Sequence, residues 1–162
     1  HLHGAEAREY LRAGLAALPR NAPLVRVEEL RDVYGMTTEL FDRIRPLVTV
    51  QGSGQVNLNS APPAVLLSLP GFTEEVALGV VRLRQGGVVI SSLGQVAASL
   101  AAGTRTRVSD ATAELMTRVT FETREVEVTS EGWLAGSPAR RSVTGLFVRG
   151  GTHLFFIGKR YR

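Results

Sequence analysis

Residue types that could perform catalysis are few and scattered in this sequence. Its three histidines are His1, His3 and His153, and His153 falls in a run with strand-like alternation. A nucleophile with its base, a phosphate-binding loop or a metal-binding set needs its residues at characteristic spacings. The 162-residue sequence contains no such set and no cysteine. We therefore expect a protein without catalytic residues and without a bound cofactor.

Two pairs of adjacent carboxylates, Glu28–Glu29 and Glu74–Glu75, are the nearest approach to an acid–base pair. Adjacent residues point to different sides of a helix, and acids in a first helical turn complement the helix dipole. We interpret both pairs as such acids. Glu6, Glu9 and Asp110 could join a carbonyl-rich loop around Ca²⁺. Their spacing does not single them out, so we expect no metal site, with calcium as the alternative.

The formal net charge of +4 raises the question of nucleic-acid binding. Residues 1–85 contain nine arginines and nine acids, so the whole excess lies in residues 86–162. A protein that binds a phosphate backbone needs its cations at the contact.

The hydrophobic share of 44% is enough for a folded core.

An internal repeat relates residues 27–44 to residues 63–80 at a shift of 36 positions. A glycine at the end of a first helix can adopt the left-handed conformation, and a threonine can cap the helix that follows. The alignment predicts two helix–hairpin–helix (SAM-like) repeats, at residues 27–45 and 60–85. The positions that define the motif are Gly35, Thr37, Asn57, Asn59, Pro62, Pro70, Gly71 and Thr73.

Local patterns predict the elements around these repeats. Asn59 or Ser60 should cap the helix that follows, with Pro62 in its first turn. We expect a small β-hairpin over 47–58, and helices over 5–18, 92–102 (ended by Gly103) and 110–117.

The end of the chain reads as an antiparallel sheet with strands over 119–129, 137–148 and 153–161. The apolar phase changes within the first strand, as a bulge would produce. Gly150 and Gly151 predict a tight turn between the last two strands. The fold class is therefore α+β, with a helical domain over 1–117 and a sheet over 118–162.

The last strand is apolar on both faces. Leu154 and Phe156 should lie on one face, and Phe155 and Ile157 on the other. In a sheet with one solvent-exposed face, apolar and polar residues would alternate along the strand instead. We therefore expect these four residues to contact the helical domain, a partner or another segment.

DNA binding is the alternative function. Helix–hairpin–helix proteins that bind DNA usually carry Gly-apolar-Gly, with bare amides facing a phosphate. Here Thr37 and Thr73 replace the second glycine, and acids follow in both copies. Because these carboxylates would repel a phosphate, we interpret the hairpins as packing elements.

Two blocks, residues 23–50 (PLVRVEELRDVYGMTTELFDRIRPLVTV) and 56–71 (VNLNSAPPAVLLSLPG), resemble the minor pseudopilin K family of type II secretion systems. Residues 4–11 (GAEAREYL) are similar to the segment that precedes them in this family. The second block alone is shared with DNA-uptake receptors of the competence type, so the order of both blocks carries the resemblance.

The resemblance implies a pilin-like subunit with a large inserted helical domain and a pilin-like sheet. Such subunits cap the tip of the pseudopilus with partners of the I and J types and help to start its assembly. The hydrophobic N-terminal helix of the family is not present in this chain. The resemblance therefore implies a soluble fragment of a membrane-anchored protein, on the periplasmic side of the inner membrane in the cell envelope.

Overall fold

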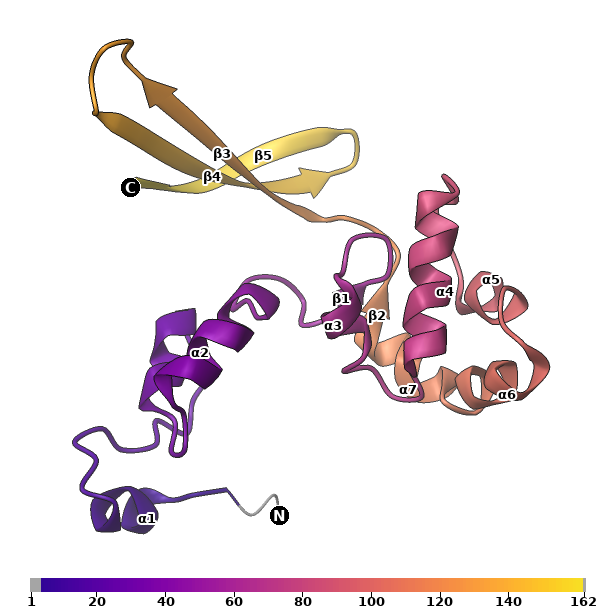
Figure 1. The fold of residues 1–162 in the computed structure, drawn as a ribbon, viewed down its shortest axis with the longest axis horizontal. Helices are drawn as coiled ribbons and strands as arrows, with labels where there is room; N and C mark the ends of the chain where they lie inside the picture. The colour runs from indigo at the N-terminus through magenta and orange to yellow at the C-terminus, as the bar shows by residue number, and fades with distance from the viewer. Residues whose placement is uncertain (1–3, 162) are drawn as a thin grey trace. The chain divides into compact units, whose positions relative to one another are not determined.

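The computed structural model describes residues 4–161. Its contacts divide the chain into two compact units, His1–Gly54 and Gln55–Arg162. Figure 1 shows the first unit in indigo and purple, and the second from magenta to yellow. Two of the three histidines, His1 and His3, lie outside the described residues.

The first unit consists of short helices. They are α1 (Ala7–Arg12), the 3₁₀ helix η1 (Val27–Asp32), α2 (Thr38–Ile44) and the 3₁₀ helix η2 (Arg45–Leu47). Among the described residues of this unit, only Tyr10 and Phe41 are buried.

The predicted helix over 5–18 was too long. It ends at Arg12 because Gly14 adopts a φ of +69°, and the backbone N–H of Leu15 turns back to the carbonyl of Tyr10. Leu15 and Leu18 therefore do not continue the helical face, and both are exposed.

The helices of the second unit surround a hydrophobic core. They are α3 (Pro63–Leu66), α4 (Glu74–Gln85), α5 (Leu93–Ala98), α6 (Ala102–Asp110) and α7 (Thr112–Arg118). The core brings together apolar residues from every one of these helices and from the segments between them. Its fully buried large side chains are Leu58, Leu66, Val76, Val80, Ile90, Val96, Val108 and Leu115.

The C-terminal end of the helix predicted over 92–102 is wrong. The structure has two helices, α5 and α6, and Gly103 lies inside α6 instead of ending a helix. The guanidinium of Arg105 explains the break, because it donates to the carbonyls of Ala97 and Leu100 at 3.2 Å each. These carbonyls at the end of α5 are thus satisfied without further helix.

The predicted β-hairpin over 47–58 does not form. Its only strand is β1 (Val56–Asn57), which pairs in parallel with β2 (Val119–Thr120) from the other end of the helical region. Val119 is buried, so this pairing joins the hydrophobic core. A long-range parallel pair of this kind leaves no local signal.

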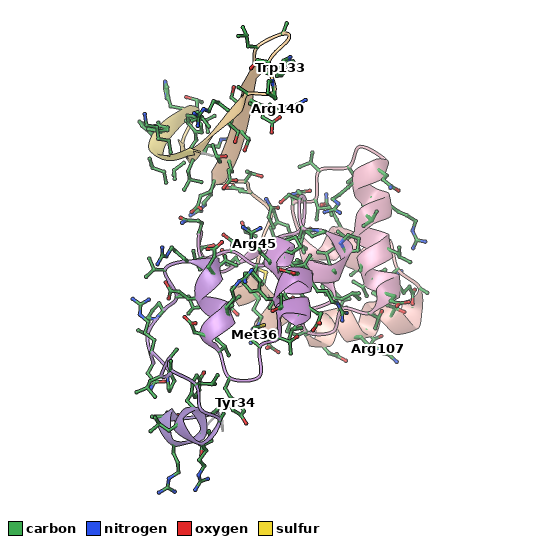
Figure 2. The ribbon with its side chains drawn as sticks, turned by 60° about the vertical axis from the view of Figure 1, so that its left-hand side comes forward. Tyr34, Met36, Arg45, Arg107, Trp133 and Arg140 are labelled. Atoms are coloured by element: carbon green, nitrogen blue, oxygen red, sulfur yellow. The ribbon has the colours of Figure 1, made fainter. Side chains whose placement is uncertain are left out.

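The antiparallel sheet at the end of the chain confirms the α+β class. Its strands are β3 (Glu125–Trp133), β4 (Arg140–Gly150) and β5 (His153–Tyr161), in the order β3-β4-β5. Figure 2 shows the cross-strand neighbours Trp133 and Arg140 beside the β3–β4 loop.

The turns and bulges of this sheet differ from the prediction in detail. Gly150 pairs with His153, so the two-residue turn is Gly151–Thr152, with Gly151 at a φ of +62°. A register shift lies where Leu146 pairs with Gly158 and Phe147 with Phe156, so the extra residue is Ile157 of β5. The phase change in residues 119–129 is instead the break between β2 and β3, which belong to different sheets.

The contacts group the chain differently from the predicted domains, since β1 pairs with β2 across the predicted boundary after residue 117. The division into 1–117 and 118–162 stays a prediction. Over residues 4–161, the helices are too short or too polar to cross a bilayer.

Candidate functional site

The turn around Gly71 is packed inside the second unit. Gly71 has a φ of +72°, and the backbone N–H of Phe72 donates to the carbonyl of Leu69 at 3.1 Å. A Cβ atom on Gly71 would lie 3.0 Å from the Cβ of Ala111 and 3.2 Å from the carbonyl oxygen of Arg107. The turn therefore lies against the corner between α6 and α7, and that side of it is closed to a ligand.

The turn around Gly35, between Tyr34 and Met36 (Figure 2), has a similar backbone in the first unit. Gly35 has a φ of +82°, and the N–H of Met36 donates to the carbonyl of Val33 at 2.9 Å. These positions correspond to those of the Gly71 turn at the shift of 36 residues. Within the described residues, nothing lies within 4 Å of a Cβ placed on Gly35. The two turns share a backbone conformation but not a packing environment.

The helices after these turns begin at the two threonines. The side chain of Thr37 accepts a hydrogen bond from the N–H of Leu40 at 3.1 Å, as the sequence predicts. Thr73 occupies the N-cap position of α4, but its side chain makes no capping bond. The first turns carry Glu39 in α2 and the Glu74–Glu75 pair in α4. Both helix starts therefore present carboxylates where a phosphate would need positive charge.

Arg84, which could have served a phosphate contact, is engaged within the unit. Its guanidinium donates to the carbonyl oxygens of Ala61 at 2.8 Å and Leu58 at 3.4 Å. The carboxylate of Glu75 accepts from the hydroxyl of Thr104. These side chains hold the turn before α3 and the start of α4, which favours a packing role for this region.

Asn57 and Asn59 join three chain segments. The amide nitrogen of Asn59 donates to the carbonyls of Ile90 and Phe121, and its oxygen accepts from the N–H of Ile90, all at 2.8 Å. Asn57 accepts from the N–H of Asn59 at 2.9 Å and donates to the hydroxyl of Thr123 at 3.0 Å. The two asparagines therefore fix the chain on both sides of the helical core.

The expected cap of α3 by Asn59 or Ser60 is wrong. Pro62 occupies the N-cap position and Pro63 is the first residue of the helix. The side chain of Asn59 is unavailable because it is bound to distant backbone groups. Pro63, which has no N–H to satisfy, starts the helix at no cost in hydrogen bonds. Pro70 directly precedes the Gly71 turn.

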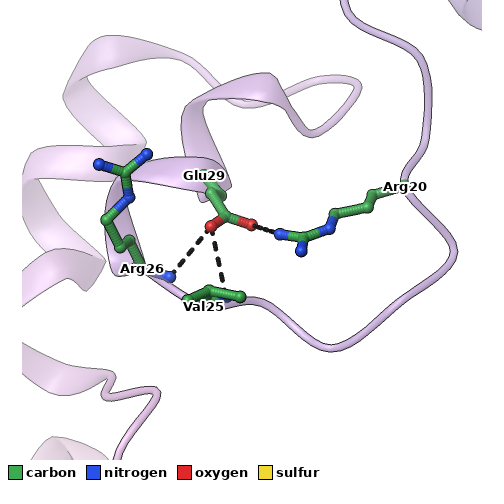
Figure 3. Close-up of polar contacts among 4 residues, drawn as sticks. All are labelled: Arg20, Val25, Arg26 and Glu29. Atoms are coloured by element: carbon green, nitrogen blue, oxygen red, sulfur yellow. Dashed lines mark hydrogen bonds and ion pairs between the residues drawn. The ribbon is translucent and has the colours of Figure 1, made fainter.

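A polar cluster around Glu29 organises the first unit (Figure 3). The Glu29 carboxylate contacts the Arg20 guanidinium at 2.6 Å and accepts from the N–H groups of Arg26 at 3.1 Å and Val25 at 3.3 Å. Desolvation would raise the pKa of Glu29, but the hydrogen bond and charge of Arg20, with the two N–H groups, lower it below its ordinary value.

Glu28 takes part in a separate ion pair. Its carboxylate lies 3.3 Å from the guanidinium of Arg45. A hydrogen bond from its own backbone N–H, followed by that from Arg45, lowers the pKa of Glu28. The two adjacent carboxylates thus have different partners, consistent with structural roles and not with a shared acid–base role.

The four apolar residues of β5 are exposed in the structure. Leu154, Phe155, Phe156 and Ile157 have 56, 57, 56 and 55% of their surface exposed. Among the sheet residues whose side chains are described, none is buried. A three-stranded sheet without a covered face is at the limit of independent stability, so this surface is the candidate interaction site.

The pairing register assigns these residues to faces, since directly opposite residues share a face. Phe156 pairs with Phe147, and Phe155 with Val148, so the two phenylalanines of β5 lie on opposite faces as predicted. Ile157 falls at the register shift and has no direct partner on β4.

One face, the Phe147 face, carries a long apolar stripe. The rings of Phe147 and Phe156 meet edge to face at 5.5 Å between centroids. The Phe147 ring also covers Gly145, where a Cβ atom would come within 2.9 Å of it. By the register, the apolar members of this face are Val126, Val128, Val143, Phe147, Leu154 and Phe156.

The opposite face, the Phe155 face, has an apolar patch near the β4–β5 turn and the exposed Trp133 at its far end. The Phe155 ring covers Gly150, where a Cβ atom would come within 2.7 Å. Leu146 and Val148 complete this apolar patch. Polar residues lie between this patch and Trp133, including a hydrogen-bonded pair of hydroxyls from Thr129 and Thr144 at 2.9 Å.

Candidate metal and catalytic positions remain separate. Over residues 4–161, no three His, Asp or Glu side chains come together as a metal site would require. Glu6 and Glu9 form a capping box at the start of α1, and Asp110 is the last residue of α6. An open hollow of about 270 Å³ is lined by Gly79, Arg82, Leu83, Gly86, Val88 and Ser99, none of which is an acid or a histidine. The expectation about calcium stays a prediction.

Comparison with known families agrees with the resemblance seen in the sequence. Residues 1–53 match the family model described as type II secretion system (T2SS), protein K. No curated protein matches the chain. The match covers the elements of the first unit, which are α1, η1, α2 and η2, together with the Gly35 turn. The family match thereby supports the resemblance to the minor pseudopilin K family of type II secretion systems over residues 1–53.

Proposed function

We propose that this protein is a noncatalytic subunit at the tip of a type II secretion pseudopilus. The observation that carries the proposal is the match of residues 1–53 to type II secretion system protein K. In this proposal the subunit assembles with minor pseudopilins of the I and J types and helps to start the fibre. It works in the cell envelope, attached to the inner membrane through a hydrophobic helix of the kind found in its family.

The terminal sheet supports an assembly role. Its two faces carry apolar side chains, and Leu154, Phe155 and Phe156 are each more than half exposed. Exposed apolar surface on a sheet needs a cover, from another segment or another chain. In this proposal the sheet is pilin-like, and the long stripe of the Phe147 face takes the amphipathic continuation of the hydrophobic helix.

The two glycine turns are, in this proposal, the hairpins of two SAM-like repeats that serve packing. The covered Gly71 turn and the carboxylates at the starts of α2 and α4 support packing over DNA binding. They therefore favour an interaction domain over a nucleic-acid receptor.

Affinity purification tests the proposal. The tagged protein should retain soluble forms of the pilin-like proteins encoded beside it, and a Phe147→Asp/Phe155→Asp variant should retain less. An unrelated periplasmic protein is the control for nonspecific retention. Recovery of the tagged protein alone, in both the wild type and the variant, would contradict the assembly role.

A further inference from the structure

The two faces of the terminal sheet differ in charge as well as in apolar pattern. On the Phe147 face, the described charged side chains are Arg141, Arg149 and Lys159, by the pairing register. The acids of β3 all lie on the other side, because Glu125, Glu127 and Glu131 alternate with its apolar and small residues.

Two of these acids border the apolar patch of the Phe155 face. Glu125 lies opposite Val148, and Glu127 lies opposite Leu146, while Phe155 is the neighbour of Val148 on the third strand. Cross-strand neighbours on one face have Cβ atoms about 5 Å apart. The patch is therefore apolar at its centre and acidic along the β3 edge.

We propose that this patch, formed by Leu146, Val148 and Phe155 with Glu125 and Glu127 at its edge, binds a partner pilin-like subunit through an apolar ridge flanked by Arg or Lys. The proposal rests on the proposed function and adds which face meets the partner and what chemistry the partner presents.

Shape and charge together assign the occupant. The Phe147 face offers an apolar stripe that runs along all three strands, which suits a long helix. The Phe155 face offers a compact patch at one end, with Thr129 and Thr144 beyond it. A small patch with a charged edge fits a local contact with a second folded chain, in which edge charges select the partner and its orientation.

Charge reversal on this edge tests the proposal. Glu125→Lys/Glu127→Lys should weaken binding of the complementary pilin-like subunit by about tenfold at low salt, with a smaller effect at high salt. Glu131→Lys is the matched control because it changes the same residue type on the same strand and face. Glu131 lies six positions from Glu125, roughly 20 Å along the strand. This control should change the affinity less than about twofold.

Isothermal titration of the purified chain with each soluble pilin-like subunit gives the affinities, and circular dichroism establishes that all variants are folded. A Phe155→Ala variant should also bind more weakly and keep the fold. If the wild type binds a subunit and the double reversal binds it equally well, the assigned patch is wrong while the proposed function stands. If the wild type binds none of them, both fail. Self-association that the double reversal abolishes would make a second copy the occupant and overturn the proposal.

Discussion

Asn59 and Ile90 form a reciprocal pair of hydrogen bonds. The side-chain oxygen of Asn59 accepts from the backbone N–H of Ile90, its amide nitrogen donates to the carbonyl of Ile90, and both distances are 2.8 Å. The Asn59 side chain thus satisfies both backbone hydrogen-bonding groups of Ile90, as a neighbouring β-strand would. Because Ile90 is fully buried, this pair fixes the loop between α4 and α5 onto the core.

Replacing Asn59 should therefore destabilise the second unit. Asn59→Ala leaves the N–H and carbonyl of Ile90 and the carbonyl of Phe121 without this partner, which should cost about 2–3 kcal/mol in the free energy of unfolding. Urea denaturation followed by circular dichroism measures the loss. Ser60→Ala, at the next and exposed position, should change stability by less than about 0.5 kcal/mol. Equal midpoints for the two variants would contradict the role given to Asn59.

The two glycine turns should differ in their tolerance of a side chain. Both residues have positive φ, so Gly35→Val and Gly71→Val should each cost roughly 1–2 kcal/mol. Gly71→Val should cost more, because its Cβ would also press on Ala111 and on the carbonyl of Arg107. Amide hydrogen exchange reports the opening free energy of each unit separately. An unchanged opening free energy in both variants would remove the assignment of these turns.

The pKa of Glu29 should depend on Arg20. A carboxylate whose pKa is lowered by folding adds stability that is present above its unfolded pKa, about 4.3, and lost as the pH falls through the folded pKa. Arg20→Ala should raise the pKa of Glu29 toward its ordinary value. The variant should therefore lose less folding stability from this group as the pH falls. NMR titration of the Glu29 carboxyl carbon measures the shift. Arg26→Ala is the control because Arg26 binds Glu29 through its backbone N–H. Equal pKa values in the two variants would argue against the ion pair.

DNA affinity should be weak. The Gly71 turn is packed, acids begin α2 and α4, and Arg84 is bound to backbone carbonyls. At about 150 mM salt we expect no saturable change in the fluorescence anisotropy of a labelled duplex. A tight complex with a steep salt dependence, lost in Arg82→Ala/Arg84→Ala, would instead support the competence-type alternative.

Local chemistry in the sequence was enough to predict several features. The positive φ of Gly35 and Gly71, the Thr37 cap and the antiparallel sheet each depend on residues within a few positions or on strand periodicity. The opposite faces of Phe155 and Phe156 follow from alternation alone.

Other features depend on distant partners and could not be read locally. The parallel pairing of Val56 with Val119 and the bonds from Asn59 to Ile90 and Phe121 join segments far apart in the sequence. The end of α5 was misplaced because Arg105, from the following helix, binds the carbonyls there. An asparagine in a short polar segment before a proline is also typical of a helix N-cap. The local sequence could therefore not distinguish this cap from the tertiary role of Asn59.

The mass of the complex formed with the neighbouring pilin-like subunits tests the central claim most directly. The complete protein, mixed with soluble I- and J-type subunits from its own gene cluster, should elute in light-scattering chromatography as a heterocomplex of defined mass, with one copy of each chain. If the complete protein elutes at its monomer mass beside every pilin-like product of that cluster, it is not a tip subunit.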